Sequence, residues 1–139
     1  MVEQYTASLW ALLLIVFTVL CQSLIATAAH RKQKQYVPGV VDENLGHASF
    51  VFRSHRTFQN SLENAPLMLF TGVIGILAGL SPASLAVVLW VFAVARLAHM
   101  LLYYGIATER NPSPRSYFYA IALLSNIVLV VMIALHMLG

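Results

Sequence analysis

Four apolar segments, each about as long as a membrane-spanning helix, take up most of this 139-residue chain. They lie at about residues 6–29, 57–80, 83–104 and 116–138. A bilayer core of about 30 Å requires about 20 apolar residues per helix, so each segment is long enough to cross it. Little chain remains between them, which predicts an all-α integral membrane protein. We expect a single domain over residues 1–139, folded as a four-helix transmembrane bundle.

The composition agrees with this class. Hydrophobic residues make up 60% of the chain and charged residues 9%, and the mean hydropathy is +0.78, which is unlike soluble globular domains. The net charge of +3 comes from the loops and suits an anionic membrane surface or a soluble anion. Nothing in the pattern indicates a nucleic-acid partner. No HxxxH or CxxC spacing occurs, so we expect no metal site.

The basic residues predict the orientation in the membrane. Seven of the eight fall in or beside the first and third connections: Arg31, Lys32, Lys34, Arg53, Arg56, Arg110 and Arg115. Because Lys and Arg favour cytosolic loops, both connections are expected in the cytosol and both termini outside it. The membrane would be a bacterial inner membrane, or the endoplasmic reticulum in a eukaryote.

Polar side chains fall on one face of three of the predicted helices. The faces span arcs of about 80°, 60° and 40° and consist of Arg53, Arg56, Asn60 and Glu63, then Arg96, His99 and Tyr103, then Arg115, Tyr119 and Asn126. In the predicted topology all three faces lie in the cytosolic half of the membrane. They therefore predict a polar, net basic cavity that opens to the cytosol.

Some of these residues have a purely structural explanation. Glu63 and Arg96 lie at a similar depth, so we expect them to form a buried ion pair. His47, in the first connection, is expected in solvent. Ser113 and Pro114 are a good N-cap and first residue for the fourth helix, which puts Arg115 and Ser116 in its first turn.

Three motifs resemble a known family. RTFQNSLENAP at 56–66, ARLAHMLLYYG at 95–105 and PRSYFY at 114–119 are similar to the membrane-associated proteins in eicosanoid and glutathione metabolism, the MAPEG family. The resemblance implies a homotrimer that binds glutathione at subunit interfaces near the cytosol. It implies that the site contains Arg56, Asn60, Glu63, His99, Tyr103, Arg115, Ser116 and Tyr119, with Arg53 on the same face and Arg31 or Lys32 from the neighbouring subunit.

The chemistry of these side chains suits glutathione. Arginines bind carboxylates in a bidentate manner, Glu63 can accept from the α-ammonium, and Asn60 can pair with an amide. A helix N-terminus with Arg115 and Ser116 lowers the pKa of a thiol, so these two are the predicted catalytic residues. The expected function is a membrane-bound glutathione transferase, with peroxidase activity as a further possibility. Glutathione would be the co-substrate, and the second substrate a lipophilic electrophile or lipid hydroperoxide from the membrane lipid.

Two other classes of function remain open. One is a family member that has lost catalysis and binds glutathione or lipid. The other is a small four-helix exporter with Glu63 as a proton site. An exporter needs a polar pathway to both faces of the membrane, and here the polar residues are confined to one half.

The predicted topology is tested by a reporter fused after Gly139. We expect activity only from a reporter that works outside the cytosol, because the two basic connections favour the cytosol and the termini then lie on the other side. A reporter that is active only in the cytosol would contradict the orientation and would place the polar cavity on the side away from cytosolic glutathione.

Overall fold

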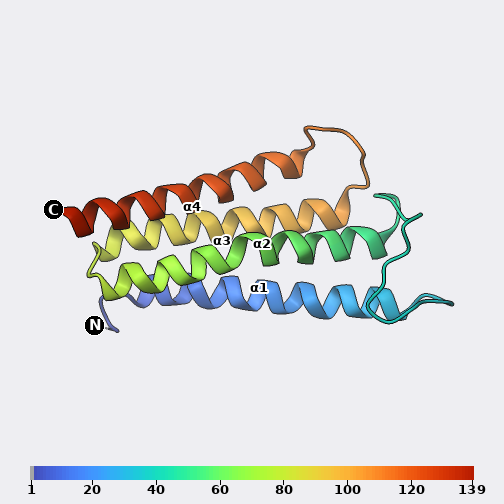
Figure 1. Ribbon diagram of the computed structural model, residues 1–139, viewed down its shortest axis with the longest axis horizontal. Coiled ribbons are helices and arrows are strands. Elements are labelled where there is room, and N and C mark those ends of the chain that lie inside the picture. Colours follow the sequence, from blue (N-terminus) through green and yellow to red (C-terminus); the bar gives the residue numbers. More distant parts are fainter. Residues whose placement is uncertain (1) are drawn as a thin grey trace.

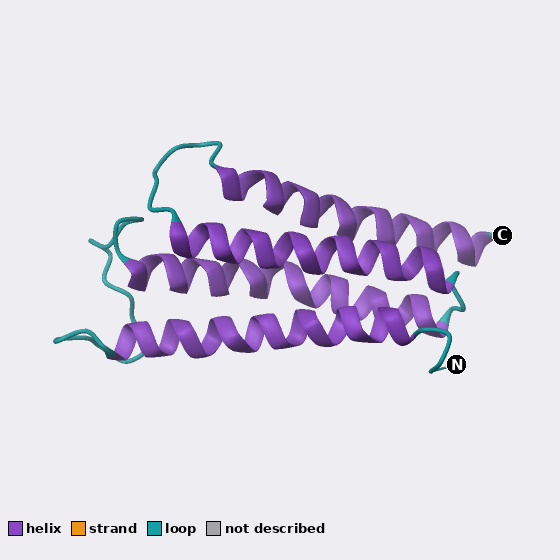
Figure 2. Cartoon of the chain, turned by 180° about the vertical axis from the view of Figure 1, so that it is seen from behind, coloured by secondary structure: helices purple, strands orange, loops and turns teal. Residues whose placement is uncertain are grey.

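The computed structural model describes residues 2–139, which form one bundle of four helices (Figure 1). The helices are α1 (Thr6–Arg31), α2 (Phe50–Leu77), α3 (Pro82–Gly105) and α4 (Pro114–Leu138). Consecutive helices run in opposite directions, so the two ends of the chain lie together at one end of the bundle. The two longer connections, residues 32–49 and 106–113, lie at the other end, which we call the loop end (Figures 1 and 2).

The central helices are α2 and α3, each of which packs against all three others. Within residues 2–139, α1 and α4 do not contact each other. The core that joins the helices is apolar, and its largest fully buried side chains include Met68, Leu85, Leu89, Phe92 and Leu129. The first and last helices are therefore held apart by the middle pair.

Gly72 allows α2 to approach α1 and α3 closely. A Cβ atom at this position would lie 2.8 Å from Cδ2 of Leu12 on α1 and 3.1 Å from Cδ2 of Leu89 on α3. Such distances are too short for carbon atoms, so a larger residue would force the two leucines to move. The glycine is used for packing within one chain.

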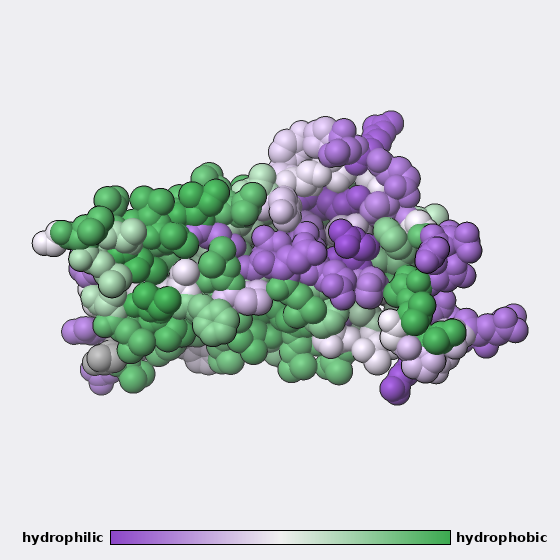
Figure 3. Space-filling model, viewed as in Figure 1, coloured by the Kyte–Doolittle hydropathy of each residue, from purple (hydrophilic) through white to green (hydrophobic). Residues whose placement is uncertain are grey.

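The outer surface of the bundle is suited to lipid. Large apolar side chains on α1 and α4 are exposed. On the face drawn in Figure 3, apolar residues dominate the half that is remote from the loop end. By length and composition, α1, α3 and α4 can each cross a membrane. The remaining predicted span, residues 57–80 in α2, is not apolar enough by the same criteria of length and composition, because the first half of α2 is polar. It nevertheless runs alongside the other three helices through the bundle (Figure 1).

The ends of the helices follow from local sequence. Ser113 and Ser116 form a reciprocal capping box and Pro114 is the first helical residue, so the predicted start of the fourth helix is confirmed. The second helix begins at Phe50 with Ser49 as its N-cap, seven residues before the predicted apolar segment 57–80. At its other end Gly79 has a φ of 75°, and the amide of Leu80 donates to the carbonyl of Gly75. This closes α2 with a Schellman motif and reverses the chain into α3.

Candidate functional site

A buried guanidinium joins α2 to α3. Arg96 is 2% exposed, and it donates from Nη1 to Oδ1 of Asn60 at 2.7 Å and from Nη2 to Oγ of Ser61 at 2.8 Å. Burying an arginine is costly unless its donors are satisfied, and here two neutral oxygens accept from its two terminal nitrogens. Nε of Arg96 is buried without a partner among the described residues.

The ion pair predicted between Glu63 and Arg96 is not formed within residues 2–139. Glu63 is exposed on the surface of α2, while Arg96 points to Asn60 and Ser61 instead. The sequence placed both charges at a similar depth but did not fix the rotation of α2, which turns Asn60 and Ser61 toward α3. Arg96 therefore remains a cation with no carboxylate bound to it.

Tyr103 and three other side chains form a cluster near the loop end. The guanidinium carbon of Arg115 lies 4.1 Å from the centre of the Tyr103 ring, in cation–π geometry. His99 meets the edge of the same ring with centroids 5.6 Å apart, and the ring of Tyr119 lies 6.5 Å from that of His99. The structure thus brings together the predicted residues His99, Tyr103, Arg115 and Tyr119 from α3 and α4.

Arg115 and Ser116 occupy the first turn of α4, as predicted. Arg115 donates from Nη2 to the carbonyl of Thr108 at 3.3 Å, and its Nη1 is buried with no partner among the described residues. The hydroxyl of Ser116 accepts from the amide of Ser113 at 3.1 Å. One guanidinium donor therefore remains unused beside the Tyr103 ring, while Ser116 helps to hold the helix start.

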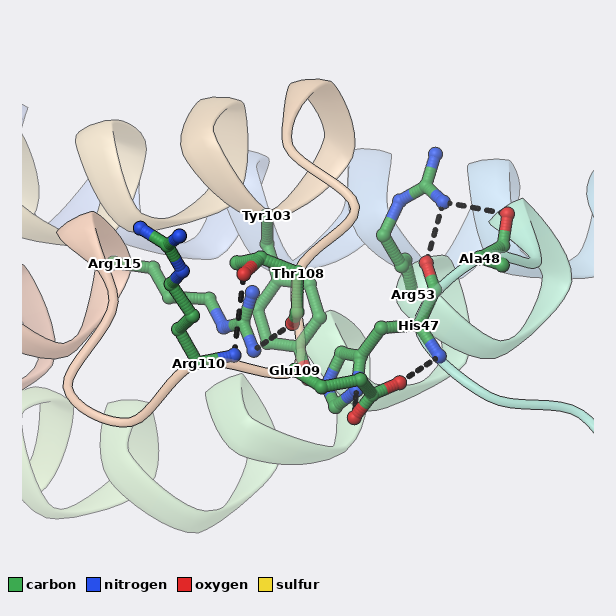
Figure 4. A network of polar contacts seen from close by, with 8 residues as sticks. All are labelled: His47, Ala48, Arg53, Tyr103, Thr108, Glu109, Arg110 and Arg115. Carbon is green, nitrogen blue, oxygen red and sulfur yellow. Dashed lines mark hydrogen bonds and ion pairs between the residues drawn. The ribbon is translucent and has the colours of Figure 1, made fainter.

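The two long connections meet at a histidine and a glutamate that the sequence analysis did not identify (Figure 4). The amide of His47 donates to Oε1 of Glu109 at 3.0 Å, and Nδ1 of His47 lies 2.7 Å from Oε2. Nε2 of His47 lies 3.0 Å from the hydroxyl oxygen of Tyr103. The expectation that His47 is solvated was wrong, because its side chain is only 20% exposed.

The Glu109 carboxylate is ionised at neutral pH. The hydrogen bonds from the side chain and the backbone of His47 hold the pKa of Glu109 below its usual range. Because this pKa is lowered in the folded state, the link between the two connections is present at neutral pH. It is lost as the pH falls through the folded-state pKa of Glu109.

Arg53 fixes the backbone of the first connection. Its Nη1 donates to the carbonyls of His47 at 2.7 Å and Ala48 at 3.0 Å, and its Nη2 donates to the carbonyl of Tyr104 at 3.3 Å. In a single chain this predicted binding residue is thus engaged with backbone oxygens. It ties α2, α3 and the first connection together beneath His47.

Other predicted residues lie outside the Tyr103 cluster. Arg31, Lys32, Arg56 and Glu63 are exposed. Arg31 lines a cavity of about 320 Å³ between the end of α1, residues 36–41 and the start of α2, together with His30 and His55. The end of α1 and the start of α4 are on opposite sides of the α2–α3 pair (Figure 1). One chain therefore does not bring Arg31 to Arg115.

No group of three or more His, Cys, Asp or Glu side chains that could hold a metal ion occurs within residues 2–139. The polar side chains that do cluster are arginines, tyrosines, a histidine and amides. Such a set offers hydrogen-bond donors and positive charge, which suits an anionic organic ligand.

Comparison with known protein families gives one match. The sequence model of the MAPEG family matches residues 7–135, which is nearly the whole chain. Comparisons with the curated proteins and with the solved structures gave no match.

The contacts of Arg96 predict which substitutions destabilise the protein. Asn60→Leu leaves a buried guanidinium donor without its acceptor and should lower the free energy of unfolding by about 1–3 kcal/mol. Glu63→Gln changes an exposed side chain and should alter it by less than about 0.5 kcal/mol. Thermal unfolding of the two variants in detergent, without added ligand, measures the difference. The reverse ranking would favour the Glu63–Arg96 ion pair.

Proposed function

Since the chain belongs to the MAPEG family, membrane proteins of glutathione and eicosanoid metabolism, we propose that it is a membrane-bound glutathione transferase. It would activate the glutathione thiolate for attack on a lipophilic electrophile, and the same thiolate could reduce a lipid hydroperoxide. The observation that carries this proposal is the position of Arg115. Its guanidinium lies in the first turn of α4, over the Tyr103 ring, with one nitrogen buried and unused.

The residues around this guanidinium suit the ligand. Glutathione carries two carboxylates, an α-ammonium group, two amides and a thiol. Exposed Arg56 and half-buried Arg115 supply donors for carboxylates or a thiolate, and exposed Glu63 supplies an acceptor for the ammonium group. Asn60 is half-buried beside Arg96 and keeps its amide nitrogen for the peptide. These assignments are proposals that rest on side-chain chemistry and position.

The chemical step needs a thiolate. A thiol near the start of α4 would lie beside a fixed positive charge and at the positive end of the helix dipole. Both stabilise the thiolate more than the neutral thiol, so they lower the thiol pKa. This is differential stabilisation of the reacting state, which raises the rate rather than the affinity alone.

The second substrate would come from the bilayer. The outward faces of α1 and α4 are apolar along their length. A lipophilic electrophile dissolved in the membrane could reach the loop-end half of the bundle by lateral diffusion. The thiolate would attack it there, and the polar conjugate would leave toward water.

We also propose that copies of the chain share each site in a homotrimer. Glu63 and Arg56 are charged and exposed on α2, and a charged group that faces lipid is costly. A second copy that covers this face would remove the cost. It could also bring its own Arg31 or Lys32 to the cluster around Arg115, which one chain cannot do.

Replacement of Arg115 tests the catalytic proposal. Arg115→Leu should lower turnover of a generic aryl halide by about 10²–10³, the scale for loss of one preorganised electrostatic donor. Glutathione affinity should fall less, and the ultraviolet thiolate absorbance of bound glutathione should fall with turnover. Arg110→Leu removes an exposed arginine of the connection that precedes α4 and serves as the matched control. Unchanged turnover and absorbance in Arg115→Leu would remove Arg115 from the catalytic group. A wild-type protein that binds glutathione without turnover would instead be a non-catalytic binding protein.

Mixed assemblies test the shared site. The double variant Arg31→Leu/Lys32→Leu and the single variant Arg115→Leu should each be poorly active alone. If each site combines α1 of one copy with α4 of another, co-expression should restore part of the activity, because some interfaces then hold both intact halves. Native mass measurement of the mixture should show three copies. Activity that stays at the level of the separate variants, or a fully active monomer, would contradict the shared site.

A further inference from the structure

At the loop end, hydrogen bonds connect Tyr103 to two residues that have no role in the proposed function, His47 and Glu109. His47 comes from the connection between α1 and α2, Glu109 from the connection between α3 and α4, and Tyr103 from α3. The three groups form a chain of hydrogen bonds, with 2.7 Å from Glu109 Oε2 to His47 Nδ1 and 3.0 Å from His47 Nε2 to the Tyr103 hydroxyl (Figure 4). The proposed function uses Tyr103 but assigns nothing to the other two.

The imidazole is held in place on several sides. Its ring meets the edge of Phe52 at 4.9 Å between centroids and stacks against Tyr103 at 5.7 Å. The backbone of His47 is fixed through its amide by Glu109 and through its carbonyl by Arg53. A loop histidine held by this many contacts has little freedom to rotate, so the position of Nε2 is well defined.

The carboxylate determines which ring nitrogen carries the proton. An ionised carboxylate only accepts hydrogen bonds, so Nδ1 of His47 must be the donor to Glu109. In the neutral imidazole Nε2 is then the acceptor, and the Tyr103 hydroxyl donates its proton to it. Because its only proton is then donated to His47, the phenol oxygen can act toward any further group only as an acceptor.

An acceptor is scarce in this part of the molecule. Arg115 lies over the Tyr103 ring, Arg53 lies beneath His47, and Arg96 is buried further along α3. All three are donors and none is paired with a carboxylate within the described residues. A ligand that carries N–H groups as well as carboxylates can use an acceptor among these donors, and the Tyr103 hydroxyl oxygen supplies one in addition to exposed Glu63.

We propose that Glu109 and His47 are positioning residues that hold the Tyr103 hydroxyl as a hydrogen-bond acceptor for an N–H group of glutathione. This inference rests on the proposed function and adds two residues that act through Tyr103. It concerns binding of the ground state rather than thiolate formation. Loss of the arrangement should therefore raise KM and leave kcat nearly unchanged.

Two substitutions of His47 separate its two contacts. The amide of asparagine reaches about as far as Nδ1, so His47→Asn keeps a donor for Glu109 and loses the contact with Tyr103. Glutamine reaches about as far as Nε2, so His47→Gln keeps an acceptor for Tyr103. His136→Asn is the matched control, because His136 Nε2 contacts the carbonyl of Ala78 at the opposite end of the bundle.

The experiment measures glutathione binding by calorimetry and steady-state kinetics, with full-length protein in detergent. His47→Asn should weaken binding about 3- to 10-fold, as for the loss of one hydrogen bond, with kcat within about 2-fold of wild type. His47→Gln should recover most of the affinity, and His136→Asn should match wild type. In a Tyr103→Phe background, His47→Asn should cause no further loss, because the group it orients is gone.

Three results would overturn the inference. They are unchanged affinity in His47→Asn, equal losses in His47→Asn and His47→Gln, and the same loss from His47→Asn with and without the Tyr103 hydroxyl. The last two would mean that His47 acts only by holding the connections together. Failure of the proposed function is distinguishable, because wild-type protein would then bind no glutathione in the first measurement.

Discussion

The guanidinium of Arg96 is buried between α2 and α3, and two oxygens of α2 must meet it there. Asn60 and Ser61 do so, which fixes how α2 is rotated and how far it is shifted along α3. Arg53 precedes Asn60 by seven residues and Tyr103 follows Arg96 by seven, so in antiparallel helices these two come level about 10 Å further toward the loop end. There Arg53 binds the carbonyls of Tyr104 and His47. One buried arginine thus sets the alignment on which the cluster around Tyr103 depends.

The two ends of the bundle are built differently. At the terminal end, Gly79 and Leu80 turn the chain directly from α2 into α3, and most of the surrounding residues are apolar. At the loop end, the connections are long enough to fold back over the helices and to meet through His47 and Glu109. The proposed site lies at this end, where the helix ends and the two connections bring side chains from several elements together.

The sequence was sufficient to predict features that depend on helical periodicity. The four helices, the start of α4 at Ser113 and Pro114, and the convergence of His99, Tyr103 and Arg115 follow from spacing along a helix and from depth in the membrane. The ion pair predicted between Glu63 and Arg96 is not formed in residues 2–139. Opposite charge and equal depth favoured it, but a helix can satisfy an arginine with amide and hydroxyl oxygens at adjacent positions. The contact between His47 and Glu109 joins two irregular segments, whose path no periodic pattern describes.

At the loop end, arginine side chains form hydrogen bonds to the protein, but their positive charge is not neutralised by carboxylates. The donors of Arg53, Arg96 and Arg115 that are paired meet carbonyls, an amide oxygen, a hydroxyl or a ring face, all of which are neutral. Within residues 2–139, the single contact between an acidic and a basic side chain joins Glu109 to His47, and it lies at the exposed rim. The polar groups are therefore stable in the bundle while their positive charge is left uncompensated. An anion that enters this region would meet donors already fixed in position, and little reorganisation would be needed to bind it.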